Sequence, residues 1–418
     1  MQAASAAGRR RLSPGELELI LTGHERLVAG KPGGRRAVLK FVDFSGVDLS
    51  GRMLTDGDFT GSVFDGCKLV KTQFERAVLF GCDLRNADLR GANLKRADLR
   101  GVCIRGANLS LADLTQADFR QAAIGIPHPT KGLNTMRHEN RTGQLDGVNF
   151  AGATLDGSHL DEASAFAADF SDCSMRGTKL TGANLKDANL SGAMLEGADV
   201  SGCNLEGARL CGAVLTGVDV ASARASGADF TGSIRTLTAE VSAQADELYE
   251  RARGGQAWCD SGGAQGAPAI FDGVDMRALT DRLRGFRLPA MRAKGACMVG
   301  LDLSGAQLQG ANLEGADLRG CNLRGADLRG ARLNGANLTK ANLREAALGA
   351  LPLGGGRTMG VAFDGARLRY ADFSGADLGG ASMDNTDVVG ANFTGAKVST
   401  ASFRGANLEE ALGFDLAA

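Results

Sequence analysis

The chain has 418 residues, of which 60 are glycine and 7 are proline, and aromatic residues make up 5% of it. The glycines follow no collagen-like period, and the composition argues against the fibrous and disordered classes. The formal net charge is −1, but residues 1–40 carry eight basic and three acidic groups, and residues 145–234 carry five and twelve. This uneven charge is compatible with an ordinary solvated surface, and also with contact to a partner or self-association through opposite charges.

The N-terminal residues predict a short tail followed by a helix. Residues 1–12 contain no apolar segment of the kind found in signal peptides, and we expect them to form a disordered tail. The run Ser13–Glu16 is typical of a helix start, because it combines a capping box with proline at the first helical position. Apolar residues at helical spacing then predict a capping helix over 13–30, on which His24 is expected to be solvated.

A five-residue period dominates residues 37–234. An apolar residue, here called the centre, recurs at every fifth position from Phe44 to Ile124 and again from Phe150 to Phe230. A period of five keeps a side chain on one face of neither a helix nor a flat strand. The chain must therefore turn a corner within each unit, where glycine tolerates positive φ and Asp or Asn satisfies backbone donors.

The period fails over residues 125–144, which predict a loop that interrupts the first repeat unit. Loops on a rigid scaffold are common sites of binding. We identify a candidate partner-binding set in this loop: His128, Lys131, Arg137, His138, Glu139 and Arg141. The run His138–Thr142 begins like the zinc motif H-E-x-x-H but has threonine in place of the second histidine, and we expect no metal here.

The second half of the chain repeats the order of the first. Residues 235–268 predict a helix and a glycine-rich linker, in which the helix ends at Gly254-Gly255. Residues 269–412 then resume the five-residue period, with a slip of two residues after Met276 and a loop at 349–360. This order indicates an internal duplication. It is compatible with one continuous column and with two tandem units.

The repeated unit reads Ala-Asp/Asn-Leu-x-Gly, as at Ala87-Asp88-Leu89, and it resembles the pentapeptide-repeat family. The resemblance covers nearly two thirds of the chain. It implies an all-β solenoid, a right-handed quadrilateral β-helix whose centres and small residues point inward. Together with the predicted helices and the internal duplication, we expect this solenoid to have short capping α-helices and two tandem units. Some members of that family bind type II topoisomerases as DNA mimics, and the acidic run 145–234 makes such a role an alternative.

The sequence holds no catalytic constellation, and we expect neither an enzyme nor a cofactor. Aspartates occur one per corner and do not form a paired acid/base site. Arginines form two clusters, with aspartates close by as ion-pair partners: Asp88, Asp98, Asp317 and Asp327. These arginines fall on successive faces and lack aromatic residues for base stacking, so nucleic-acid binding is not expected.

Cysteine usage and hydropathy bear on location. Several cysteines occupy the small inward position of the repeat, and no C-x-x-C occurs. No stretch approaches the ~18 apolar residues of a membrane span. We therefore expect a cytoplasmic, non-enzymatic scaffold or protein–protein interaction module, with a protein partner, no membrane contact and the option of self-association.

Overall fold

The computed structural model describes residues 9–128 and 132–414. It divides into two compact units, Met1–Thr236 and Leu237–Ala418. The helices are α1 (Pro14–Val28), α2 (Ala239–Ala243) and α3 (Ala245–Asp260), with 3-10 turns η1 (Val220–Ser222) and η2 (Arg277–Leu279). The strands are β1 (Ala122–His128), β2 (Gly132–Arg141), β3 (Val214–Leu215), β4 (Ile234–Arg235), β5 (Leu351–Gly354) and β6 (Arg357–Met359).

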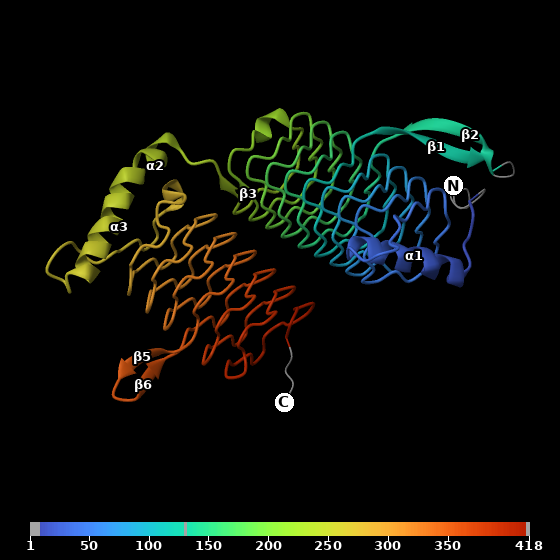
Figure 1. Ribbon diagram of the computed structural model, residues 1–418. Coiled ribbons are helices and arrows are strands. Elements are labelled where there is room, and N and C mark those ends of the chain that lie inside the picture. The colour runs from blue at the N-terminus through green and yellow to red at the C-terminus, as the bar shows by residue number, and fades with distance from the viewer. Residues whose placement is uncertain (1–8, 129–131, 415–418) are drawn as a thin grey trace. The chain divides into compact units, whose positions relative to one another are not determined.

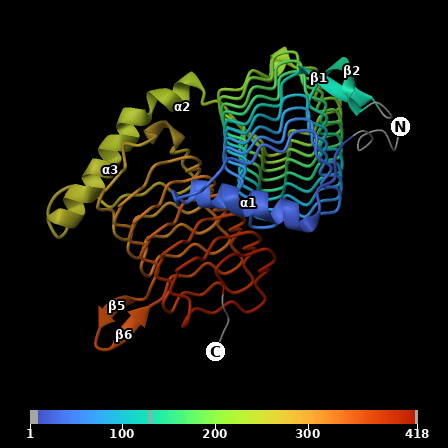
Figure 2. The same ribbon diagram turned by 45° about the vertical axis from the view of Figure 1, so that its right-hand side comes forward.

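Unit 1 is a β-helix solenoid with four five-residue units in each coil (Figures 1 and 2). Its backbone forms parallel bridges between residues one coil apart: Val38 pairs with Asp58, and Asp58 with Val78. Each five-residue unit contributes a single bridging residue, because the chain turns a corner before a longer strand can form. The family resemblance implied a right-handed β-helix, and that handedness stays a prediction.

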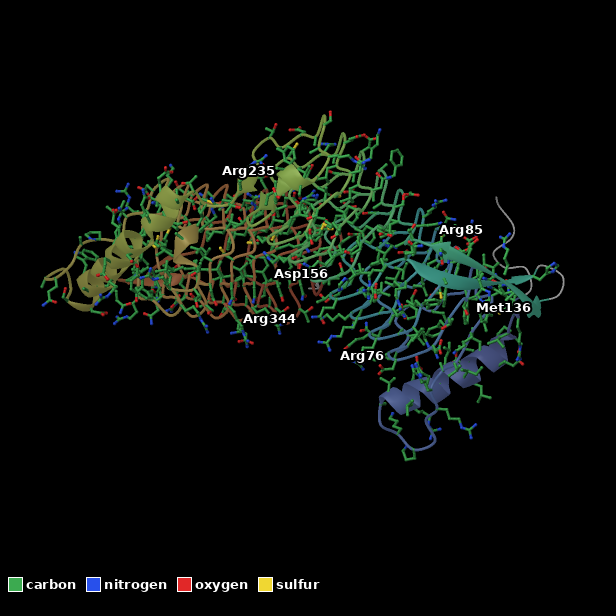
Figure 3. The ribbon with its side chains drawn as sticks, turned by 90° about the horizontal axis from the view of Figure 1, so that it is seen from above. Arg76, Arg85, Met136, Asp156, Arg235 and Arg344 are labelled. Carbon is green, nitrogen blue, oxygen red and sulfur yellow. The ribbon has the colours of Figure 1, made fainter. Side chains whose placement is uncertain are left out.

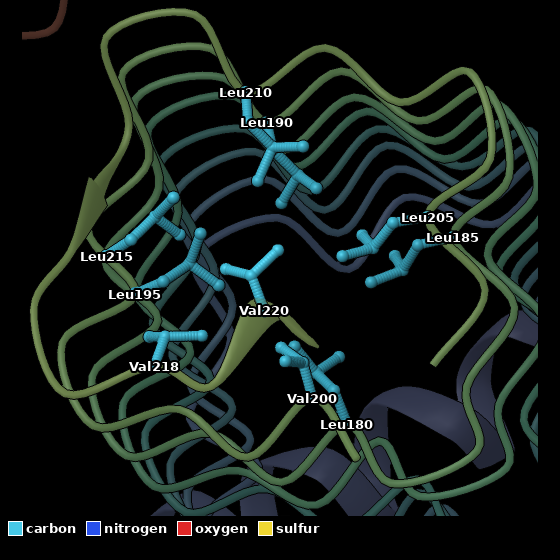
Figure 4. A pocket seen from close by; sticks show the side chains of 10 residues that line it. All are labelled: Leu180, Leu185, Leu190, Leu195, Val200, Leu205, Leu210, Leu215, Val218 and Val220. Atoms are coloured by element: carbon cyan, nitrogen blue, oxygen red, sulfur yellow. The ribbon is translucent and has the colours of Figure 1, made fainter. Parts of the chain in front are cut away.

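The interior of each coil is filled by the centres and the small residues. Phe59 and Cys82 are fully buried, and the Cys82 thiol donates to the carbonyl oxygen of Phe59 at 3.0 Å. Burial raises the pKa of Cys82 to about 12, so the thiol stays protonated at neutral pH. Near Val220, a cavity of about 10 Å³ is lined by leucine and valine alone, and Figure 4 shows these side chains pointing inward. It is too small for a ligand.

Helix α1 crosses the N-terminal end of unit 1 (Figure 2). Ser13 and Glu16 form the capping box that the sequence predicts. The expectation that His24 is solvated is wrong, because only 1% of this residue is exposed. Its Nδ1 accepts a hydrogen bond from the backbone N–H of Ala37 at 3.1 Å, and burial lowers its pKa. A neutral histidine therefore joins the helix to the first coil.

The predicted disordered tail, 1–12, falls partly outside the described residues, since the structure describes none of residues 1–8. The next four residues are not a free tail. The backbone of Arg10 pairs in parallel with Val42, and the Arg10 carbonyl oxygen accepts a hydrogen bond from the Asp43 backbone N–H at 2.9 Å. Arg9 donates from Nε to the carbonyl oxygen of Gly61 at 2.8 Å. This segment is held because the edge of the first coil offers it backbone partners.

Unit 2 begins with α2 and α3, and α3 corrects the predicted helix end. The helix runs through Gly254-Gly255 to Asp260 instead of stopping there. Gly255 is buried, and a Cβ at this position would lie 2.6 Å from the Cβ of Ala269 and 3.1 Å from Leu288. This glycine lets the helix approach the first coil of unit 2 closely, and it does not end the helix.

The coils of unit 2 have their own hydrophobic core, separate from that of unit 1. Arg287 pairs with Gln307 at the ordinary spacing of one coil, whereas Ile270 pairs with Arg292 in a slightly longer coil. The turn η2 lies in that longer coil and absorbs the slip that the sequence shows after Met276. The loop predicted at 349–360 is the hairpin β5–β6, which lengthens its coil so that Arg332 pairs with Ala362.

The predicted ion pairs between aspartates and nearby arginines are confirmed in both units. Aspartate stands one residue before a centre and arginine one residue after it, so both side chains leave the same outward face. The distances are 2.8 Å for Arg90–Asp88, 2.7 Å for Arg100–Asp98, and 2.6 Å for Arg319–Asp317 and Arg329–Asp327. Exposed pairs such as Arg90–Asp88 contribute little stability each.

Candidate functional site

The hairpin β1–β2 leaves unit 1 at a corner and returns to the same coil. Cys103 pairs with Asp83 on one side at the ordinary spacing, and on the other side it pairs with Gln144, beyond the hairpin. The hairpin is therefore an insertion that makes one coil about twice as long without shifting its register. The two strands are antiparallel, and Ala122 pairs with Arg141. The interruption predicted at 125–144 is thus a folded hairpin that begins at Ala122.

Ile124 fixes the hairpin to the side of the coils. It is 3% exposed, and its Cγ2 would lie 3.0 Å and 2.8 Å from Cβ atoms built on Gly81 and Gly101. These two glycines occupy the same corner of successive coils, at φ of 64° and 63°. In the sequence Ile124 continues the five-residue series, but here it belongs to the hairpin. The next centre after Phe119 is Leu145.

Arg141 adds polar contacts beside Ile124. Its Nε donates to the carbonyl oxygen of Gly101 at 2.5 Å, and its Nη2 donates to that of Gly81 at 2.9 Å. Burial lowers the pKa of this guanidinium, because the charged form loses solvation. Arg141 thus anchors the hairpin, in addition to any role in contacting a partner.

A cleft of about 300 Å³ lies between the hairpin and the coils. We call it the arginine cleft, since its charged lining consists of Arg9, Arg85, Arg105, Arg137, Arg141, Asp83 and Glu139. Figure 3 labels Arg85, from a coil, and Met136, from the hairpin. Five guanidinium groups and two carboxylates give the cleft an excess of positive charge.

The arginines of the cleft differ in how firmly they are held. The Arg85 guanidinium donates hydrogen bonds to Asp83 from Nε at 2.8 Å and from Nη2 at 2.7 Å. Nε of Arg105 lies 3.1 Å from Oδ2 of Asp146. Nη2 of Arg137 lies 3.8 Å from Oε2 of Glu139, and 79% of the Arg137 side chain is exposed. The Arg85 guanidinium is therefore fixed by its pair, and Arg137 can reorient toward a ligand.

Arg9 is the least satisfied of these arginines. Its Nε is bound to Gly61, but its Nη1 is buried and, among the described residues, has no hydrogen-bond partner. Burial lowers the pKa of this guanidinium. A buried cationic donor without an acceptor is costly, and it is the kind of group that an anionic ligand would satisfy.

The structure brings together some of the predicted partner-binding residues. Arg137, Glu139 and Arg141 line the arginine cleft, because alternate residues of a strand share one face. His138 lies between them in sequence and is exposed, but it does not line the cleft. His128 is exposed at the end of β1, and Lys131 lies outside the described residues.

The sequence did not predict that Arg9, Arg85 and Arg105 lie beside the hairpin residues in the arginine cleft. Arg85 and Arg105 are separated by one full coil, so their spacing could have placed them on one face. Arg9 gave no such signal, because it precedes the repeats.

Other chemistry at the cleft is limited. Burial raises the pKa of the Cys103 thiol, which lines the cleft, so this sulfur is not an activated nucleophile. Over the part of the chain that is described, His, Cys, Asp and Glu form no group of three that could hold a metal ion. The described helices include none that is both long and apolar enough to span a bilayer.

A comparison with protein families finds pentapeptide repeats over residues 43–124, 144–232, 292–349 and 362–399, more than half of the chain. The matches stop at both hairpins and at the linker between the units. No curated protein matches the chain.

Solved structures with some similarity include pentapeptide-repeat proteins. HetL, involved in heterocyst differentiation regulation in the cyanobacterium Nostoc sp. strain PCC 7120, is 18% identical, with 96% of this chain and 94% of HetL covered and a TM-score of 0.18. A trypsin-treated form of QnrB1, a plasmid-mediated fluoroquinolone resistance protein, is 20% identical over 50% of this chain and 86% of its own, with a TM-score of 0.26. Rfr23 from the cyanobacterium Cyanothece 51142 is 25% identical over 35% of this chain and 90% of its own, with a TM-score of 0.16. These TM-scores are low, and the likeness says nothing about a ligand or partner.

Proposed function

Because the chain belongs to the pentapeptide repeat family, we propose that it is a non-enzymatic protein-interaction module that contacts its partner through the hairpin β1–β2. One observation carries the proposal: the hairpin is an insertion that the coil register does not need, yet Ile124 and Arg141 hold it in a defined place. An insertion held rigidly on a scaffold is suited to recognition. The filled interior of the coils supports a binding surface on the outside.

The experiment is affinity capture with a register-preserving deletion. Removing residues 122–142 joins Gln121 to Gly143, which leaves Phe119 and Leu145 five positions apart, as in every other unit. Removing residues 351–360 does the same for Leu348 and Phe363, and it supplies the matched control in unit 2. Melting curves of both variants would check that the coils remain folded.

We expect the same partner to be captured from the native cell by the wild type and by the 351–360 deletion, and to be lost from the 122–142 deletion. Undiminished capture by the 122–142 deletion would show that the hairpin is not the contact. In that case the interaction would have to be sought on the coil faces.

We also propose that α1 and α3 act as caps of two tandem solenoids. Each helix buries apolar residues against the first coil of its own unit: Leu21 in unit 1, and Leu248 and Ala252 in unit 2. A solenoid needs such covers, since its open end exposes core and unpaired backbone. A cytoplasmic, reducing location belongs to the same proposal, and it is supported by nine cysteines that are all free thiols.

The alternative is a DNA-mimic role toward a type II topoisomerase through residues 145–234. In its favour, these residues carry twelve acidic and five basic groups in coils without an insertion. Against it, some of these carboxylates serve the coil: Asp156 accepts from Ser174 Oγ at 2.6 Å and from the Arg176 backbone N–H at 2.9 Å. A gyrase supercoiling assay that is unchanged by excess protein would eliminate this alternative.

A further inference from the structure

We propose that the arginine cleft binds a short acidic segment of the protein partner, through the carboxylates of Asp or Glu side chains. This inference rests on the proposed function, and it specifies the chemistry that the hairpin recognises. The first argument is charge. The cleft gathers five guanidinium groups and two carboxylates within about 300 Å³, which leaves an excess of positive charge in its lining.

The second argument is the state of Arg9. The bond from its Nε to Gly61 orients the guanidinium, while Nη1 is buried without an acceptor among the described residues. Arg9 also lines the cleft, so a carboxylate that enters the cleft and draws the guanidinium toward itself would replace no existing hydrogen bond of Nη1. A charge-assisted hydrogen bond to a carboxylate is among the strongest that this group can form.

The third argument is the arrangement of the cleft around Arg9. Arg141 is fixed on the glycine corner, and Arg85 is fixed by Asp83. Arg105 and Arg137 also line the cleft, and more than half of each side chain is exposed. A cleft that combines held cations with exposed ones suits a peptide that places one carboxylate at Arg9 and its neighbouring carboxylates at the exposed arginines.

The lining also distinguishes an acidic peptide from a nucleic acid. Asp83 and Glu139 interrupt the basic lining, whereas proteins that bind single-stranded nucleic acid use a positively charged groove that follows the backbone. The residues that line the cleft include no aromatic side chain on which a base could stack. The observations therefore favour a peptide.

The test is a direct binding measurement with fluorescein-labelled hexaglutamate, followed by fluorescence anisotropy with the full chain at low salt. We expect Arg137→Gln to weaken binding about threefold, as for an exposed ion pair, and Arg9→Gln to weaken it about tenfold or more, as for a buried charged donor. The matched control is Arg357→Gln, an exposed arginine on the other hairpin, which should leave the affinity unchanged. Deletion of 122–142 should abolish binding.

Three results would overturn the inference. One is no hexaglutamate binding by the wild type, and another is equal affinity in the wild type and the 122–142 deletion. The third is tighter binding of a single-stranded oligonucleotide than of hexaglutamate, which would assign the cleft to phosphates. If the partner is still captured by Arg9→Gln and Arg137→Gln but lost on deletion of 122–142, the proposed function stands and the acidic-segment inference fails.

Discussion

Replacing Gly101 with alanine should loosen the hairpin β1–β2 more than it disturbs the coil. The new Cβ would lie 2.8 Å from Cγ2 of Ile124, where ordinary contacts begin near 3.4 Å, and 3.5 Å from the Cβ of Ala122. The hairpin must therefore move outward by several tenths of an ångström. Overpacking of this kind costs about 1–3 kcal/mol. The φ of 63° adds about 1 kcal/mol for any residue with a side chain.

Gly66→Ala separates these two costs. Gly66 occupies a corner of the same unit at φ 64°, and a Cβ there would meet nothing within 4 Å. Gly66→Ala should thus lower the free energy of unfolding by only about 1 kcal/mol. Gly101→Ala should lower it by about 2–4 kcal/mol if the hairpin stays docked, or by less if the hairpin detaches.

Urea unfolding combined with native-state hydrogen exchange measures both outcomes. In Gly101→Ala, amides of β1 and β2 should exchange faster than in the wild type, while amides of the coils keep their protection. Gly66→Ala should leave hairpin exchange unchanged. If the two variants show the same stability loss and the same hairpin exchange, then Ile124 does not press on this corner, and the docking described above is wrong.

Two further predictions concern the helices. Gly255→Ala should destabilise unit 2 by about 1–3 kcal/mol in urea unfolding, because its Cβ would meet Ala269. The control is Gly254→Ala, because a Cβ there would approach only the Ala267 backbone nitrogen, at 4.0 Å. This variant should be neutral or stabilising by up to about 1 kcal/mol. Destabilisation by both substitutions would contradict the packing of α3 described here. Acid should weaken unit 1 through His24, whose pKa is lowered by burial. The unfolded chain binds the proton near its ordinary pKa of 6.5, so this contribution is present above that pH and is lost as the pH falls through the lower, folded value. His24→Gln should flatten the dependence of the unfolding midpoint between about pH 7.5 and 5, and an unchanged slope would argue against a buried neutral histidine.

The five-residue period made the solenoid predictable, because every centre has the same environment one coil away. The same regularity made the start of the hairpin, at Ala122, unpredictable from the sequence. Ile124 stands five residues after Phe119 and is apolar, so it matches the period although it packs on the outside of the coils. Gly254-Gly255 misled in another way, since glycine is common both at helix ends and at close contacts.

The arginine cleft could be predicted only in part. Arg137, Glu139 and Arg141 were found because they lie where the period fails. Arg85 and Arg105 lie where it holds, and their proximity to the hairpin depends on which corner the hairpin leaves. Arg9 depends on backbone contacts of a segment that has no repeat at all. The positions of Arg9, Arg85 and Arg105 in the cleft therefore depend on tertiary structure that the sequence pattern does not specify.

The two hairpins lengthen their coils by different amounts, as the pairs Cys103–Gln144 and Arg332–Ala362 show, and the length that the first one adds is not a multiple of the five-residue unit. Only the two ends of each insertion must meet the geometry of a corner. The length and sequence of the hairpin can therefore vary without changing the positions that form the core. Exchanging the hairpin would therefore change the part of the surface that it forms, while the coils keep their core.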